Sequence, residues 1–218
     1  NYSKKFLGPV SLNEALSQSL NIPTIRLSEE IGRDVVRNVA SGFGTGEKLA
    51  SGPALALGVS EATLIDMVTA YAGILNQGVS VTPFGLIELQ LSGEESALME
   101  VTTGPGRRVI SSTAAHNLIF MMQNVMAVGT GQKAAIEGWQ TAGKTGTTQS
   151  ARDAWFIGFS SDYVIGVWMG YDDNTPLIGV TGGGLPAEIW KATMLRAQGN
   201  LHPKVLVKTH QKPAEARQ

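Results

Sequence analysis

The chain has 218 residues, the usual size of one domain, and 43% of them are hydrophobic, so a sizeable core can form and a wholly disordered chain is excluded. The 17 basic and 18 acidic residues leave a net charge of -1, which argues against a nucleic acid partner. Cysteine is absent, and this excludes disulfides, thiol nucleophiles and zinc–thiolate sites.

Four helices are predicted in the first third of the chain. Ser11 and Glu14 have the spacing of a capping box, which predicts that a helix begins there. Pro23 suits the first turn of a second helix over residues 24–31, and a third helix is predicted over 34–41. A fourth helix carries its apolar side chains on one face, at Leu64, Met67, Val68, Tyr71 and Leu75.

The rest of the chain is predicted to add strands. Short β-segments are predicted at residues 80–82, 86–91 and 97–102, and a long helix over 113–128 follows them. Three further strands are predicted at 142–148, 154–159 and 163–169. A closing helix over 185–196 is predicted to turn Ile189, Trp190 and Met194 inward. This order of elements favours a sheet with helices packed on it.

The most informative segment for chemistry is Lys144-Thr145-Gly146-Thr147. On a strand, Thr145 and Thr147 point to the same face, and two hydroxyls beside an ammonium suit an anion such as a carboxylate. Gly146 exposes the backbone, so an extended peptide could pair with the strand edge. Taken alone, the segment is more typical of an ordinary threonine-rich edge strand with a solvated lysine.

A second polar segment, Ser19-Leu20-Asn21, lies where the first helix is predicted to end. Its hydroxyl and amide would lie on the same side of a loop, although polar residues also end helices for purely structural reasons. Ser-x-Asn followed downstream by Lys-Thr-Gly-Thr gives the second and third motifs of the serine acyltransferases that include penicillin-binding proteins and class A β-lactamases.

The chain resembles the C-terminal part of the transpeptidase domain of class A, bifunctional penicillin-binding proteins. The segments that carry the resemblance are residues 8–16, 19–23, 55–60, 70–72, 78–83, 143–148, 152–159, 168–172 and 181–183. It implies an α+β fold in which helices pack on an antiparallel sheet, as in serine β-lactamases and penicillin-binding transpeptidases. It also implies that residues 1–200 belong to this domain and that 201–218 form a C-terminal extension.

The family's nucleophile lies in a Ser-x-x-Lys motif upstream of Ser-x-Asn, and no lysine of this sequence has a serine three positions before it. We therefore expect the chain alone to have no acyl-transfer activity. The resemblance implies that the nucleophile segment, a glycosyltransferase domain and a membrane anchor belong to an upstream part of the same protein. It places the domain in the periplasm, at the extracytoplasmic face of the bacterial inner membrane.

By resemblance, the complete enzyme is a serine D,D-transpeptidase that cross-links peptidoglycan stem peptides ending in D-Ala-D-Ala and is acylated by β-lactam antibiotics. The resemblance implies that Ser19 relays protons, that Asn21 holds the amide of the acyl donor, and that Lys144 supplies positive potential. Thr145 and Thr147 would hold the donor carboxylate, and the Thr147 amide would give half of the oxyanion hole. No cofactor or metal is implied.

Two alternatives stay open. A D,D-carboxypeptidase or β-lactamase would use the same motifs, although residues 152–159 are more similar to the transpeptidases. A non-catalytic module that binds β-lactams or peptidoglycan would also fit the missing nucleophile. The presence of both Ser19 and Lys144 favours an enzyme, because a module that only binds has little chemical reason to keep this pair.

Overall fold

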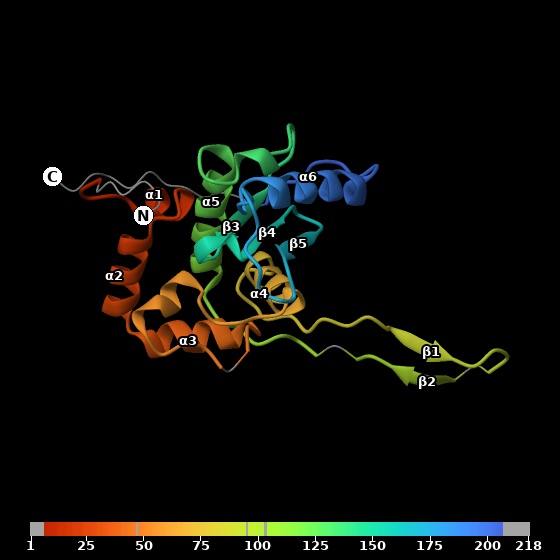
Figure 1. Ribbon diagram of the computed structural model, residues 1–218. Coiled ribbons are helices and arrows are strands. Elements are labelled where there is room, and N and C mark those ends of the chain that lie inside the picture. The colour runs from red at the N-terminus through yellow and green to blue at the C-terminus, as the bar shows by residue number, and fades with distance from the viewer. Residues whose placement is uncertain (1–6, 47, 95, 103, 207–218) are drawn as a thin grey trace.

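The structure is a computed structural model that describes residues 7–46, 48–94, 96–102 and 104–206 (Figure 1). The first third is helical, as predicted. It contains α1 (Leu12–Ser17), α2 (Asn21–Ile31), α3 (Arg33–Gly42), the short 3-10 helix η1 (Pro53–Leu57) and α4 (Leu64–Leu75). Side-chain caps fix two of the helix starts: the Ser11 hydroxyl accepts from the Glu14 amide, and Thr63 and Asp66 form a capping box before α4.

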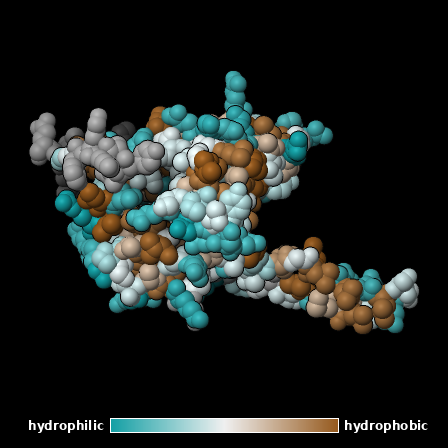
Figure 2. Space-filling model, in the orientation of Figure 1, coloured by the Kyte–Doolittle hydropathy of each residue, from teal (hydrophilic) through white to brown (hydrophobic). Residues whose placement is uncertain are grey.

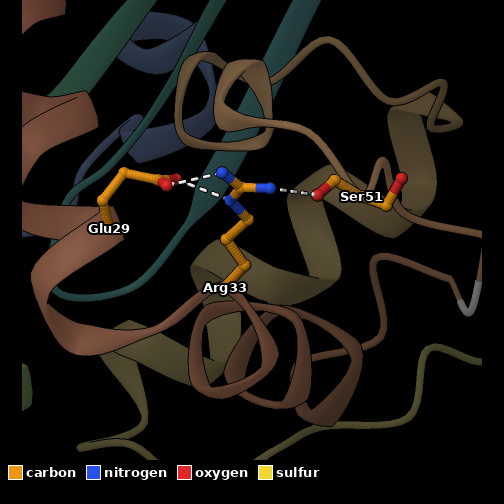
Figure 3. A network of polar contacts seen from close by, with 3 residues as sticks. All are labelled: Glu29, Arg33 and Ser51. Carbon is orange, nitrogen blue, oxygen red and sulfur yellow. Dashed lines mark hydrogen bonds and ion pairs between the residues drawn. The ribbon is translucent and has the colours of Figure 1, made fainter.

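A bidentate ion pair holds α2 against α3 (Figure 3). Gly32, with a φ of 101°, lets the chain turn between the two helices, and Arg33 then reaches back to Glu29, with its Nε 2.6 Å from the carboxylate. The same guanidinium donates to the Ser51 carbonyl at 3.0 Å. The hydrogen bonds from Arg33 lower the pKa of the Glu29 carboxyl. This junction connects the C-terminal end of α2 to the start of α3.

The central sheet has three antiparallel strands in the order β3 (Ala142–Thr147), β4 (Asp153–Phe159) and β5 (Val164–Gly170). One face is covered by α6 (Leu185–Gln198), whose buried Trp190 donates to the Gly158 and Ile165 carbonyls and packs on Phe156. On the other face α4 lies over β5, so close that a Cβ at Gly166 would meet Val68 and Leu64. The predicted α+β fold with helices on an antiparallel sheet is confirmed.

A long helix, α5 (Ser112–Ala127), lies along β3 and carries the second part of the core. Its buried face includes Ile119 and Met122, which pack with Ala142 and Phe159 of the sheet. Leu118 and Met121 of the same helix are half-buried. The core therefore has two clusters, one under α6 and one between α5 and the sheet.

A two-stranded ribbon projects from this body (Figure 1). It consists of β1 (Glu88–Gln90) and β2 (Ala97–Glu100), which pair antiparallel with each other and with no other strand of the described residues. Its large hydrophobic side chains are exposed, and Figure 2 shows them as a brown stretch along the projecting part. We call residues 86–102, as far as they are described, the arm.

Two local predictions outside the candidate site were wrong. Residues 80–82 do not form a strand: only Val79, just before them, makes an isolated bridge, to Arg108, and Pro83 cannot donate to a ladder. Ile189 does not point inward but is 39% exposed, because the buried stripe of α6 follows a four-residue step through Trp190, Met194 and Gln198. Of the predicted C-terminal extension, residues 207–218 lie outside the described residues.

Candidate active site

Ser19 lies in the short turn between α1 and α2, and the end of α1 fixes its backbone. The Leu20 amide donates to the Ala15 carbonyl at 2.8 Å, and the Ser19 amide donates to the Leu16 carbonyl at 3.1 Å. This pair of bonds is the Schellman motif, which places the residue after the helix cap in the left-handed region. Ser19 accordingly has a φ of 53°, where glycine is the usual residue, and its side chain is exposed.

Asn21 lies two positions further on, as the first residue of α2, and is exposed. The sequence predicts a loop at this residue, whereas the helix begins at Asn21 with Leu20 as its N-cap. The earlier start is possible because Pro23 is tolerated in the first turn of a helix, where amide groups lack intrahelical partners. Ser19 and Asn21 are therefore positioned by two helices that meet at Leu20.

The loop that follows α5 holds the end of α1 in place. The Thr130 amide donates to the Ser17 carbonyl at 3.1 Å, and the Gln18 side-chain amide donates to the Val128 carbonyl at 3.1 Å. Gly129 makes this approach possible, since a Cβ there would lie 2.2 Å from the Ser17 carbonyl oxygen. The turn that contains Ser19 is thereby fixed to the end of α5, and α5 in turn packs along β3.

Lys144 of β3 connects the two predicted motifs. Its Nζ donates to Ser19 Oγ at 2.8 Å, across 125 positions of sequence, and to the Thr145 carbonyl at 3.0 Å. The strand register places Lys144 opposite Ile157 and Gly146 opposite Trp155, on the face away from Phe156 and α6. The structure thus brings the Ser-x-Asn and Lys-Thr-Gly-Thr segments together at one place.

The environment of Lys144 favours its neutral form. Its side chain is half-buried between β3 and the helical part, and this desolvation lowers the pKa of Lys144 from 10.5 to about 8. The described ion pairs include none that involves Lys144, so its hydrogen bonds are to a neutral hydroxyl and a carbonyl. An amine with this pKa can hold a proton or release it close to neutral pH, which suits proton transfer through Ser19.

The two threonine hydroxyls of β3 are each held from behind. Thr145 Oγ1 lies 2.7 Å from Thr130 Oγ1, and Thr147 Oγ1 accepts a hydrogen bond from the Gly182 amide at 3.0 Å. Thr145 is half-buried and Thr147 is exposed. Both residues lie on the same face of β3, as the alternation of the strand predicts. One hydroxyl can therefore be oriented by a side chain and the other by a backbone amide.

Gly146 lies between the two threonines, where the backbone is closely packed. A Cβ there would lie 3.2 Å from Trp155 Cβ, and a Cβ on Gly182 would lie 2.4 Å from the Gly146 carbonyl oxygen. One edge of β3 is used by β4, and among the described residues no strand pairs with the other edge. That edge keeps backbone groups available to an extended peptide.

Thr130 and Gly182 were missed as candidate site residues. The glycines on both sides of Thr130, and the run Thr181-Gly182-Gly183, were signals of close backbone approach that could have indicated them. Across the described ranges, no three His, Asp or Glu side chains gather in a way that could hold a metal ion. Within the same ranges, no helix is both long and apolar enough to cross a membrane.

Comparison with known proteins gives consistent matches. The family model described as "Penicillin binding protein transpeptidase domain" matches residues 1–195. Penicillin-binding protein 1A of Aquifex aeolicus is 33% identical over 79% of this chain and 23% of that protein. Penicillin-binding protein 1B of Haemophilus influenzae is 31% identical over 84% of this chain and 24% of its own length. The chain thus spans about a quarter of these curated relatives.

Two solved structures show the same arrangement of the backbone. Penicillin-binding protein 1A from Haemophilus influenzae has a TM-score of 0.86 and 25% identity, and the match covers 95% of this chain and 37% of that one. The PonA1 protein from Mycobacterium tuberculosis, solved in complex with penicillin V, has a TM-score of 0.84 and 25% identity, and the match covers 94% and 61% of the two chains. The chain therefore belongs to the penicillin-binding protein transpeptidase family, as its motifs predicted, with class A proteins of the 1A and 1B type as its curated relatives.

Proposed function

We propose that the chain is part of a peptidoglycan D,D-transpeptidase that transfers an acyl group from stem peptides ending in D-Ala-D-Ala. The observation that carries this proposal is the 2.8 Å contact between Lys144 Nζ and Ser19 Oγ. A hydroxyl fixed beside an amine whose pKa is lowered to about 8 can pass protons between a nucleophile and a leaving or attacking amine.

The resemblance to the family implies roles for the other residues, and their chemistry is compatible with these roles. Asn21, at the start of α2, would hold the amide of the acyl donor. Thr145 and Thr147, which lie on the same face of β3, would bind the donor's terminal carboxylate with their hydroxyls. The Thr147 amide would supply one donor to the oxyanion, and loss of one such donor typically costs about 3–4 kcal/mol of transition-state stabilisation. Gly146 would let the peptide approach the strand.

We further propose residues 1–200 as the transpeptidase part and 201–218 as an extension. The nucleophile segment, a glycosyltransferase domain and a membrane anchor would be supplied by other parts of the same protein, at the outer face of the bacterial inner membrane. Stem peptides and β-lactams would be the ligands. The support is the class of the curated relatives and the penicillin V bound to PonA1.

The absence of Ser-x-x-Lys from the 218 residues allows a direct test. We expect the chain by itself to remain unlabelled by a fluorescent penicillin, because its sequence lacks the Ser-x-x-Lys motif in which the family's nucleophile lies. The full-length protein should be labelled with a stoichiometry of one. Stoichiometric labelling of the chain alone would mean that it contains its own nucleophile.

In the full-length protein, Ser19→Ala and Lys144→Ala should each slow acylation by about a hundredfold or more, because each removes one side of the proton-transfer contact. Thr193→Val is the matched control, since among the described residues its hydroxyl bonds only the Ile189 carbonyl of its own helix. Normal acylation rates in both site variants would refute these roles.

The products of the full-length protein distinguish the enzyme classes. Cross-linked dimers indicate a transpeptidase, released D-alanine indicates a carboxypeptidase, and rapid turnover of the lactam indicates a β-lactamase.

A further inference from the structure

Thr130 is the residue that physically joins the two halves of the candidate site. Its amide donates to the Ser17 carbonyl at 3.1 Å, two residues before Ser19. Its hydroxyl oxygen lies 2.7 Å from Thr145 Oγ1, one residue after Lys144. Nothing in the proposed mechanism uses this hydroxyl, although it is half-buried and directed at a residue that the mechanism does use.

The backbone around Thr130 shows that this position is closely defined. The chain can bring Thr130 to Ser17 only because Gly129 has no side chain, and a Cβ at Gly131 would lie 3.2 Å from both Phe156 and Val125. Gly183 lies against the carbonyl group of Thr130, since a Cβ on Gly183 would lie 2.3 Å from the Thr130 carbonyl oxygen. The backbone of Thr130 is therefore closely fixed, and the β-branched side chain has few χ1 rotamers from which to place its hydroxyl.

The direction of the hydroxyl protons can be worked out from the neighbours. The Gly182 amide can only donate, so Thr147 Oγ1 accepts from it and keeps its own proton for another acceptor. The Thr130–Thr145 pair can be arranged in either direction. If Thr145 donates to Thr130, its single proton is used; if Thr130 donates to Thr145, the Thr145 proton stays available for a ligand.

We propose that Thr130 is a positioning residue that donates to Thr145 Oγ1 and so leaves the Thr145 proton for the carboxylate of the ligand. Thr145 and Thr147 would then each present one hydroxyl proton to the same carboxylate, with Thr130 behind the first and the Gly182 amide behind the second. This inference rests on the proposed function, because it takes the carboxylate of an acyl donor or a β-lactam as the ligand. Thr130 itself touches no ligand.

The test uses the full-length protein and the concentration dependence of acylation by a penicillin, which separates the apparent dissociation constant from the limiting rate. Thr130→Val keeps the shape of the side chain and removes the hydroxyl. We expect the apparent dissociation constant to rise about tenfold, because one hydrogen bond that supports a charged ligand is lost. The limiting rate of acylation should change by less than about threefold. Thr130→Ser should restore tight binding.

A second ligand separates positioning from a structural role. The methyl ester of the same penicillin lacks the charged carboxylate, so its acylation should respond to Thr130→Val by less than about twofold. In a Thr145→Val background, adding Thr130→Val should cause no further loss, because the two hydroxyls act as one unit. Thr193→Val is again the control. If the unfolding midpoint of Thr130→Val falls below that of this control, Thr130→Ala is used in its place.

The outcomes separate this inference from the function on which it rests. If the wild-type protein is not acylated by the penicillin at all, the proposed function fails and this inference fails with it. If the wild-type protein is acylated but Thr130→Val binds the acid as the wild type does, only the role of Thr130 is overturned. An equal loss for the acid and the ester would likewise overturn it, since it would indicate a general distortion of the site.

Discussion

At the scale of single residues, Ser19 has a backbone that suits glycine and a proposed role that needs a hydroxyl. Its φ of 53° results from the Schellman motif at the end of α1, and a non-glycine residue in the left-handed region costs roughly 1 kcal/mol. The chain keeps serine there, and the hydroxyl accepts from Lys144. Strain that persists beside a hydrogen bond joining the two motifs is typical of a functional site.

This conflict between backbone and side chain predicts an unusual order of stability for two variants of Ser19. Ser19→Gly should have a free energy of unfolding about 1 kcal/mol higher than Ser19→Ala, because glycine relieves the left-handed strain and alanine does not. Urea unfolding followed by circular dichroism measures the difference. At Ser41, within α3, the order should be reversed because glycine weakens a helix. The same order at both positions would mean that Ser19 does not occupy the left-handed region in solution.

Lys144 predicts a dependence of stability on pH. Its pKa falls to about 8 on folding, so between about pH 8 and its unfolded value near 10.5 the unfolded chain binds a proton that the folded chain lacks. Stability should therefore rise with pH in this window, and the cost of burying the charge is present in full below pH 8. Lys144→Met should increase the free energy of unfolding at pH 7 by on the order of 1–2 kcal/mol, after allowing for partial exposure.

The measurement compares wild type and Lys144→Met by urea unfolding at pH 7 and pH 10.5. The advantage of the variant should have almost disappeared at the higher pH, because wild-type Lys144 is then neutral when folded. Lys191→Met serves as the control: it removes the same charge from an α6 lysine for which no ion pair is recorded in the described residues. An advantage of equal size at both pH values would rule out desolvation of the ammonium as its cause.

At the scale of elements, the site depends on how closely the loop after α5 approaches α1. Gly129→Ala would place a Cβ 2.2 Å from the Ser17 carbonyl oxygen, and a backbone atom cannot give way as a flexible side chain can. We expect a loss of about 1–3 kcal/mol in the free energy of unfolding. In the full-length protein, acylation should slow as well, because the turn that holds Ser19 is displaced from Lys144.

Gly52→Ala is the matched control for this change. Gly52 has a φ of -87°, which alanine adopts easily, and nothing lies within 4 Å of a Cβ built there. Thermal unfolding of the two variants gives the comparison. Equal midpoints for Gly129→Ala and Gly52→Ala would show that the loop has room that its packing does not indicate.

Most elements could be predicted from the sequence, because caps, glycines and apolar periodicity are local signals. Ser11 caps α1 and the spacing of Trp190 and Met194 marks the buried side of α6, as expected. Residues 80–82 were misassigned because strand formation needs a partner strand, and local propensity does not show whether one exists. The candidate site could be predicted only through the order of two motifs. The Thr130–Thr145 contact depends on a loop path that no local pattern determines.

At the scale of the whole molecule, the chain consists of a packed body and an exposed arm. The arm's strands pair only with each other in the described residues, and Ile87 and Leu98 are 68% and 59% exposed. A lone two-stranded ribbon is only marginally stable in water. We therefore expect amide exchange in β1 and β2 to be orders of magnitude faster than in β4, the central strand of the sheet. Equally slow amide exchange in the three strands β1, β2 and β4 would mean that the arm is covered in solution.

The arm also contains a pair of like charges, and a single substitution can turn it into a pair of opposite charges. Glu88 and Glu100 lie directly opposite each other on β1 and β2, both are exposed, and residues 86–102 contain no lysine or arginine. Like charges in this arrangement destabilise a ribbon, and opposite charges stabilise it, by roughly 0.2–1 kcal/mol each. Glu100→Lys should therefore slow amide exchange at β1 and β2 severalfold while the unfolding midpoint of the body stays unchanged.

Glu94→Lys makes the same charge change beside the turn, away from the pair, and should protect the arm less. Equal protection by the two variants would assign the effect to the arm's total negative charge and would contradict a pairwise interaction between Glu88 and Glu100.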